Sequence, residues 1–189
     1  MNYILYFFFF SFAGWILETV YASVRFRKYI SKQTLLRLPL CPIYGIGAVA
    51  MIITLYPVRN SVLLTFCGGF FVASCVEYLV ALFYERYFRV SWWDYYGNIG
   101  NFDGKVCVKM SIIWGVIAIV FFRSILPLVD VVLNKMSSYL KLITSVWLLI
   151  VFFADYKSTL QEIRKYADNK KSLAEGKFWA LKIIKINNM

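Results

Sequence analysis

The chain contains no histidine, and only 10 of its 189 residues are aspartate or glutamate. Without histidine it lacks the side chain that most often moves protons near neutral pH and the imidazole ligand of catalytic metal sites. The four cysteines, at positions 41, 67, 75 and 107, form no Cys-x-x-Cys pair. Neither a disulfide framework nor a zinc site is therefore expected, and we predict no metal and no cofactor.

The sequence also lacks a Gly-x-x-x-x-Gly-Lys-Ser/Thr phosphate loop. Because that loop is what cradles the phosphates of ATP in most transport ATPases, any ATP-driven mechanism would need a separate ATPase subunit.

What the chain has in abundance is apolar surface: 61% of its residues are hydrophobic and 20% are aromatic. Soluble domains are about 45–50% apolar, so the composition indicates an integral membrane protein. The 21 Lys and Arg residues give a net charge of +11. In a membrane protein this excess is typical of cytoplasmic loops that contact anionic lipids, and we do not expect nucleic-acid binding.

Five segments are predicted to cross the membrane, which makes the fold all-α, a polytopic helix bundle. They cover residues 3–24, 40–57, 62–84, 106–126 and 139–154. The bundle is expected to occupy residues 1–154 and to be followed by a basic cytoplasmic tail, residues 155–189. Residues 177–186 of the tail resemble an amphipathic helix that rests on the membrane surface.

Positive charge predicts the orientation of these spans. Residues 25–40 carry five Lys or Arg residues and no acid, and residues 85–105 contain Arg86 and Arg89. Cytoplasmic loops are enriched in such residues, so the N-terminus is expected outside and the C-terminus inside. On this scheme residues 127–138 connect two spans on the outer side of the membrane. Their only charged residues are Asp130 and Lys135.

Two glutamates lie within predicted spans. Glu18 interrupts the first, and Glu77 belongs to a stripe of small residues in the third, together with Gly69, Ala73 and Ala81. Each lies about 22 Å along a helix that starts outside, so both are expected at similar depth in the cytoplasmic half. A carboxylate in the membrane should face the protein interior. The two either share one site or are separate, each hydrogen-bonded to its own neighbours or protonated.

The beginning of the second span, residues 40–47, contains Pro42, Gly45 and Gly47. Short segments interrupted by glycine and proline often expose backbone groups to a ligand or a water-filled cavity. The same small residues also allow close packing between helices. The sequence leaves both interpretations open.

The segment from Trp92 to Gly115 is unlike a simple connector, because aromatic, acidic, amide and lysine side chains crowd into it. We interpret it as a cytoplasmic or re-entrant loop. This loop would form the wall of a polar cavity that opens to the cytoplasm. The predicted ligand-binding residues are Glu18, Glu77 and Asp94 as acids, Arg37, Lys105, Lys109, Tyr44 and Tyr95 as groups that compensate their charge, Trp15, Trp93 and Trp114 as walls, and Asn101. Lys109 could instead extend to lipid headgroups.

Several short motifs occur in a fixed order along the first two thirds of the chain. They are Gly14-Trp15-x-x-Glu18, Pro39-Leu40-Cys41-Pro42-Ile43-Tyr44-Gly45-x-Gly47, Glu77-Tyr78, Trp93-Asp94-Tyr95, Asn101-x-x-Gly104-x-x-Cys107 and Ser111-x-x-Trp114-Gly115. Over about residues 5–130 they resemble the CmpB-like, type IV family of ABC-transporter permeases. One departure is that Gln33-Thr34-Leu35 stands where the family usually has Arg-Gly-Phe, so Arg37 is the candidate replacement for that arginine.

The resemblance implies a multi-pass protein of the bacterial plasma membrane and suggests transport. The expected function is a permease subunit that binds a polar or cationic solute. Because five spans are few for a transport path, we expect a homodimer or a hetero-oligomer with an ATPase. Two alternatives remain, a membrane-embedded enzyme acting on a lipid-linked substrate and an accessory or immunity protein without transport of its own.

Overall fold

The computed structural model describes residues 3–27, 37–88, 91 and 93–168, and these residues are helical or lie in loops. The helices are α1 (Tyr3–Phe26), α2 (Pro42–Leu55), α3 (Val62–Phe88), α4 (Val108–Val120), α5 (Leu126–Asn134) and α6 (Ser138–Asp168). A single 3-10 turn, Tyr56–Val58, follows α2, and a π-helical segment, Phe121–Ile125, joins α4 to α5. The predicted all-α class is confirmed.

Four helical stretches are long and apolar enough to span a membrane: Tyr3–Phe26, Val62–Tyr87, Val108–Asn134 and Ser138–Gln161. A shorter apolar helical stretch, Pro42–Val58, corresponds to the predicted second span. Four to five membrane-spanning helices are therefore present, as the sequence predicts. The predicted surface helix at 177–186 lies outside the described residues.

The connection after the fourth span differs from the prediction. The helix does not end at Leu126 but runs through Pro127 to Asn134, so only residues 135–137 connect it to α6. Proline has no N–H to donate to the carbonyl four residues before it. Here the backbone N–H of Leu126 bonds the carbonyl of Phe121, five residues earlier. This wider turn accommodates the proline, and Asp130 consequently lies on a helix rather than in a loop.

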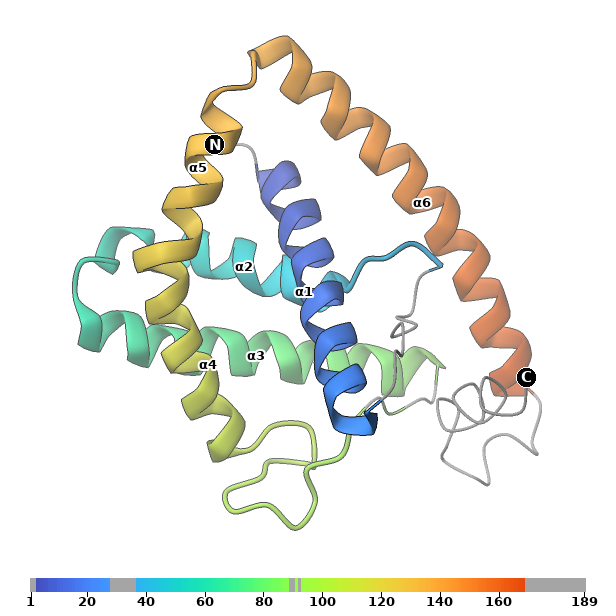
Figure 1. Ribbon diagram of the computed structural model, residues 1–189. Coiled ribbons are helices and arrows are strands. Elements are labelled where there is room, and N and C mark those ends of the chain that lie inside the picture. The colour runs from blue at the N-terminus through green and yellow to red at the C-terminus, as the bar shows by residue number, and fades with distance from the viewer. Residues whose placement is uncertain (1–2, 28–36, 89–90, 92, 169–189) are drawn as a thin grey trace.

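The helices form two crossed pairs. In Figure 1, α2 and α3 lie side by side and cross α1 and α4, while α6 runs apart from them along one edge. The most extensive contacts join α3 to α4, α1 to α2 and α2 to α3. Few residues of α6 are buried within the protein; among positions 138–161 these are Ser145 and Thr159.

Small residues set the close approach at the crossings. A Cβ atom on Gly45 would lie 2.2 Å from the Ser11 Oγ, and one on Gly69 would lie 2.2 Å from the Cβ of Ala118. The stripe that includes Gly69 therefore does bring a neighbouring helix close, as predicted, and that neighbour is α4. At the beginning of α2, Gly45 packs tightly against α1, whereas a Cβ on Gly47 would meet nothing within 4 Å.

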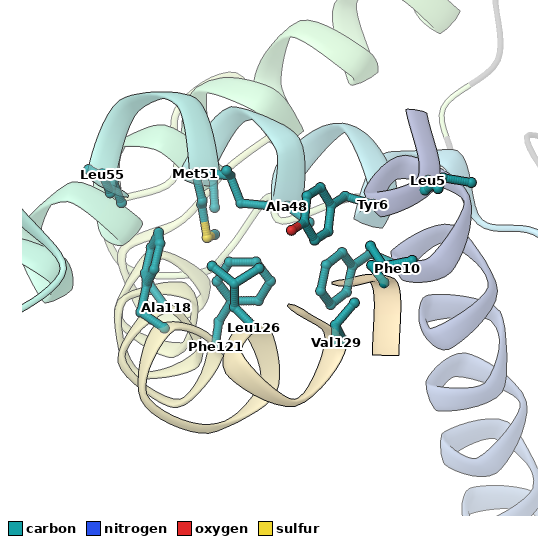
Figure 2. Close-up of a cluster of buried hydrophobic side chains, with 14 residues drawn as sticks. Leu5, Tyr6, Phe10, Ala48, Met51, Leu55, Ala118, Phe121, Leu126 and Val129 are labelled. Atoms are coloured by element: carbon teal, nitrogen blue, oxygen red, sulfur yellow. The ribbon is translucent and has the colours of Figure 1, made fainter. Parts of the chain in front are cut away.

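One contiguous apolar core joins α1, α2, α4 and α5. Figure 2 shows Tyr6 and Phe10 of α1 facing Phe121, Leu126 and Val129. All five side chains are buried, with exposed fractions of 7% or less. The core lies toward the N-terminal end of α1, so it occupies one side of the protein and leaves the other side to polar contacts.

The predicted orientation can be tested by cysteine labelling. The scheme places Asn60, in the turn between α2 and α3, outside, and Asn98, in the loop between α3 and α4, inside. We expect a membrane-impermeant maleimide to label Asn60→Cys in intact cells and to label Asn98→Cys only after the membrane is opened. Wild-type protein serves as the control for its four native cysteines. The reverse pattern would invert the topology.

Candidate functional site

Glu77 of α3 is buried, with only 5% of its surface exposed. Its Oε1 accepts a hydrogen bond of 2.8 Å from the Tyr95 hydroxyl, and its Oε2 accepts one of 3.2 Å from the Trp114 indole N–H. Tyr95 belongs to the loop before α4 and Trp114 belongs to α4 itself. The carboxyl group is thus held between α3, α4 and the loop that joins them.

Glu18 of α1 is partly buried, and its Oε1 accepts a hydrogen bond of 2.7 Å from the Tyr44 hydroxyl of α2. The absence of a side chain at Gly14 makes this contact feasible. A Cβ on Gly14 would lie 2.4 Å from the ring of Tyr44, and Gly14 precedes Glu18 by about one helical turn. The ring lies against the glycine and its hydroxyl reaches the carboxylate.

The two glutamates are connected through an aromatic contact. The rings of Tyr44 and Trp114 meet edge to face, with their centroids 6.0 Å apart. Burial raises the pKa of Tyr95 above its ordinary value, the negative charge of Glu77 raises it further, and that of Glu18 adds a smaller contribution.

The loop before α4 is folded by its glycines. Gly97, Gly100 and Gly104 have positive φ angles, a conformation that glycine adopts without steric cost. The Tyr95 N–H donates to the Gly104 carbonyl at 2.8 Å, which brings the two arms of the loop together. This pairing fixes the backbone of Tyr95, so its side chain can point toward Glu77.

Three other predicted site residues shape this loop rather than contact the glutamates. Asp94 is exposed, and its Oδ1 accepts a hydrogen bond of 2.7 Å from the Tyr96 N–H. The indole of Trp93 donates to the Lys105 carbonyl at 2.8 Å. Asn101 donates to the Asn98 carbonyl at 3.0 Å. We assign these residues the role of positioning Tyr95 toward Glu77.

The predicted charge partners lie elsewhere. The Lys105 ammonium is 2.8 Å from Glu85 and 3.1 Å from Asp103, and the hydrogen bond with Glu85 is the main reason that the pKa of Lys105 is raised. Glu85 lies about 12 Å beyond Glu77 along α3. Lys109 is exposed in the first turn of α4. Neither lysine is brought to Glu18 or Glu77.

Arg37 and Trp15 complete the predicted set. The backbone N–H groups of Arg37 and Leu38 donate to Asp155 of α6, at 3.0 and 3.1 Å. The indole of Trp15 stacks on Phe12, with ring centroids 5.8 Å apart. The sequence did not predict this role of Asp155, which holds in place the segment that leads into α2.

Two further polar contacts were not predicted. The Ser74 and Ser111 hydroxyls are 2.6 Å apart between α3 and α4, and the Tyr6 hydroxyl donates to Asp130 between α1 and α5. Ser74 lies three residues before Glu77, so the helical period could have shown that it shares a face with the glutamate. Asp130 was missed because Pro127 was interpreted as the end of the helix.

The site is chemically an acceptor site. Ionised carboxylates only accept hydrogen bonds and attract positive charge. In the described part of the chain, no group of three or more Cys, Asp or Glu side chains is placed to hold a metal ion.

Comparison with known proteins gives one finding. A family model described as "Putative ABC-transporter type IV" matches residues 5–160, extending past residue 130, where the resemblance stated from the sequence ends. No curated protein and no solved structure matches the chain. Since the match covers most of the sequence and the helices are apolar enough to span a membrane, the chain is a membrane protein that belongs to the type IV ABC-transporter family.

Proposed function

We propose that the chain is the membrane subunit of a transport system and that it binds a polar or cationic solute between Glu18 and Glu77. The observation that carries the proposal is the connected set Glu18–Tyr44–Trp114–Glu77, in which two carboxylates from different helices share an aromatic wall. The site opens toward the cytoplasm, because both glutamates belong to the cytoplasmic halves of their predicted spans.

The charge of the site supports a cation as its ligand. Both groups that donate to Glu77, the Tyr95 hydroxyl and the Trp114 indole, are neutral. Burying an ionised carboxylate without a cation costs several kcal/mol. A bound cation would remove this cost, and the faces of Tyr44 and Trp114 add favourable cation–π contact.

The chain supplies no ATP-binding loop, so a separate ATPase subunit would power transport. The loop before α4 is the proposed docking surface, since it joins α3 to α4 and also positions Tyr95 against Glu77. Through this loop, movement of the ATPase would reach the solute site. We place the protein in the bacterial plasma membrane, in contact with anionic lipids and assembled as a homodimer or hetero-oligomer.

The arrangement favours transport over catalysis on a lipid-linked substrate. An enzyme of that kind would need Lys105 and its basic neighbours to hold a phosphate. Lys105 is instead engaged by Glu85 and Asp103, and Lys109 is exposed. In a further alternative, the polar residues serve only to hold the helices together. That alternative predicts no ligand-dependent change in Tm.

The binding proposal can be tested on the full chain in lipid nanodiscs, with tetramethylammonium and spermidine as probes and NaCl at matched ionic strength as the reference. A probe present at 100 times its Kd should stabilise the fold by about 2.7 kcal/mol, measured as a rise in Tm. We expect Glu18→Gln to remove the rise while the protein remains folded.

Glu85→Gln is the matched control, because it removes one carboxylate that lies outside the proposed site. It should keep the probe-dependent rise in Tm. If neither probe shifts the Tm of the wild type, or if the shift is identical in Glu18→Gln, the proposal of a carboxylate-lined cation site is wrong.

A further inference from the structure

The face of α1 that turns toward the other helices carries more than the proposed site. Tyr6, Phe10, Gly14 and Glu18 recur every four residues, so they lie along one side of the helix. Tyr6 and Glu18 are twelve residues, hence about 18 Å, apart along the axis. The stripe has a hydrogen-bonded polar side chain at each end.

The polar group at the far end is paired with a second acid. Tyr6 is buried, with 6% of its surface exposed, and its hydroxyl donates to the carboxylate of Asp130, which is partly buried on α5. This pair contains an acid and a phenol, as do Glu18 with Tyr44 and Glu77 with Tyr95. The same acceptor chemistry therefore occurs near both ends of the bundle.

An aromatic contact separates the two polar regions. The ring centroids of Phe10 and Phe121 lie 5.0 Å apart, and the ring of Phe121 also contacts that of Phe122. Phe10 lies between Tyr6 and Glu18 on α1, and Phe121 lies between Trp114 and Asp130 on the helix formed by α4 and α5. Figure 2 shows Phe10 and Phe121 facing one another within the core. We call this pair the aromatic gate.

The helix beside the gate contains a feature that can bend. The π-helical segment Phe121–Ile125 begins at the gate residue itself and precedes Pro127. π-helical turns and prolines are where helices bend, and π turns occur often at functional sites. Bending within this segment would change the position of Phe121 relative to Phe10.

We propose that Tyr6 and Asp130 form a second, outer binding station for the same cationic solute, and that the aromatic gate separates it from the Glu18–Glu77 site. The inference rests on the proposed function. In the arrangement described here the gate is closed, so solute at Glu18 and Glu77 has no path outward. Bending at the π segment would open the gate and let the solute reach Asp130.

The test measures leak of radiolabelled tetramethylammonium from proteoliposomes that contain the full chain. We expect Phe10→Ala combined with Phe121→Ala to increase the leak about tenfold, which corresponds to lowering a barrier by ~1.4 kcal/mol. Adding Asp130→Asn should return the leak toward the wild-type rate. Phe9→Ala combined with Phe12→Ala is the matched control, since both side chains are exposed on the same helix.

Phe121→Leu provides a gentler variant, because it removes the ring and keeps an apolar side chain, and it should leak in the same direction. The inference is overturned if both gate variants are folded and as tight as the control, or if the leak is unchanged by Asp130→Asn. In either case a Glu18-dependent rise in Tm would leave the proposed function standing. If the Glu18-dependent rise in Tm is absent but the leak requires Asp130, the proposed inner site is wrong and the outer station stands.

Discussion

Gly69→Ala is expected to prevent native packing of α3 against α4. The added Cβ would lie 2.2 Å from the Cβ of Ala118, 3.2 Å from the Trp114 carbonyl oxygen and 3.4 Å from the Cα of Gly115. Carbon atoms pack best at about 3.5–4.0 Å. None of these three atoms can move by a change of rotamer, so the helices themselves must separate.

Alanine favours helix formation over glycine by up to about 1 kcal/mol, which partly offsets the clash. Overpacking usually costs about 1–3 kcal/mol and occasionally more, and here it falls at the largest helix contact of the fold. We therefore expect a clear drop in Tm and in the yield of monodisperse protein. The control is Gly47→Ala, whose Cβ would meet nothing within 4 Å and which should be neutral or slightly stabilising. Equal Tm values for the two variants would show that the α3–α4 crossing is not packed as described.

The spans could be predicted from the sequence because length and apolarity determine which helices suit a membrane. That a neighbouring helix approaches α3 closely was also predictable from its stripe of small residues, but only the structure identifies that neighbour as α4. The end of the fourth helix was not predictable. Pro127 usually marks a helix end, and only the shifted backbone bond from Leu126 to Phe121 reveals that this helix continues.

The similar depth of Glu18 and Glu77 along two helices was the basis for predicting one shared site, and that shared site stays a prediction. The partners of Lys105 were not predictable. They depend on the path of the loop, which folds back through glycines at positive φ and places the ammonium beside Glu85. Sequence distance gives no measure of such a path. Asp94 and Asn101 were predicted to bind ligand because amide and carboxylate groups do so often, yet here they hydrogen-bond the backbone of their own loop.

Glu77→Gln is expected to lower cation affinity by at least about 100-fold. At an effective dielectric constant of about 20, a carboxylate 4 Å from a cation contributes roughly 4 kcal/mol, and a factor of 100 corresponds to about 2.7 kcal/mol. The variant should still fold. Its carbonyl can accept the Trp114 N–H, and its amide can donate to the Tyr95 hydroxyl, which is able to accept as well as donate. The measurement is tetramethylammonium binding by the full chain in nanodiscs, with Tm as the check on folding.

Tyr95→Phe separates the charge of Glu77 from its hydrogen bonding. This variant keeps the carboxylate and removes only the donor that bonds Oε1 at 2.8 Å, so we expect a far smaller loss of affinity than in Glu77→Gln. When both substitutions are combined, the amide introduced by Glu77→Gln loses its acceptor and is left buried without a partner, which costs about 1–3 kcal/mol. The Tm of the double variant should therefore fall below that of Glu77→Gln alone. If Tyr95→Phe instead abolishes binding as fully as Glu77→Gln, the hydroxyl itself contacts the solute, and the charge of Glu77 is not the main source of affinity.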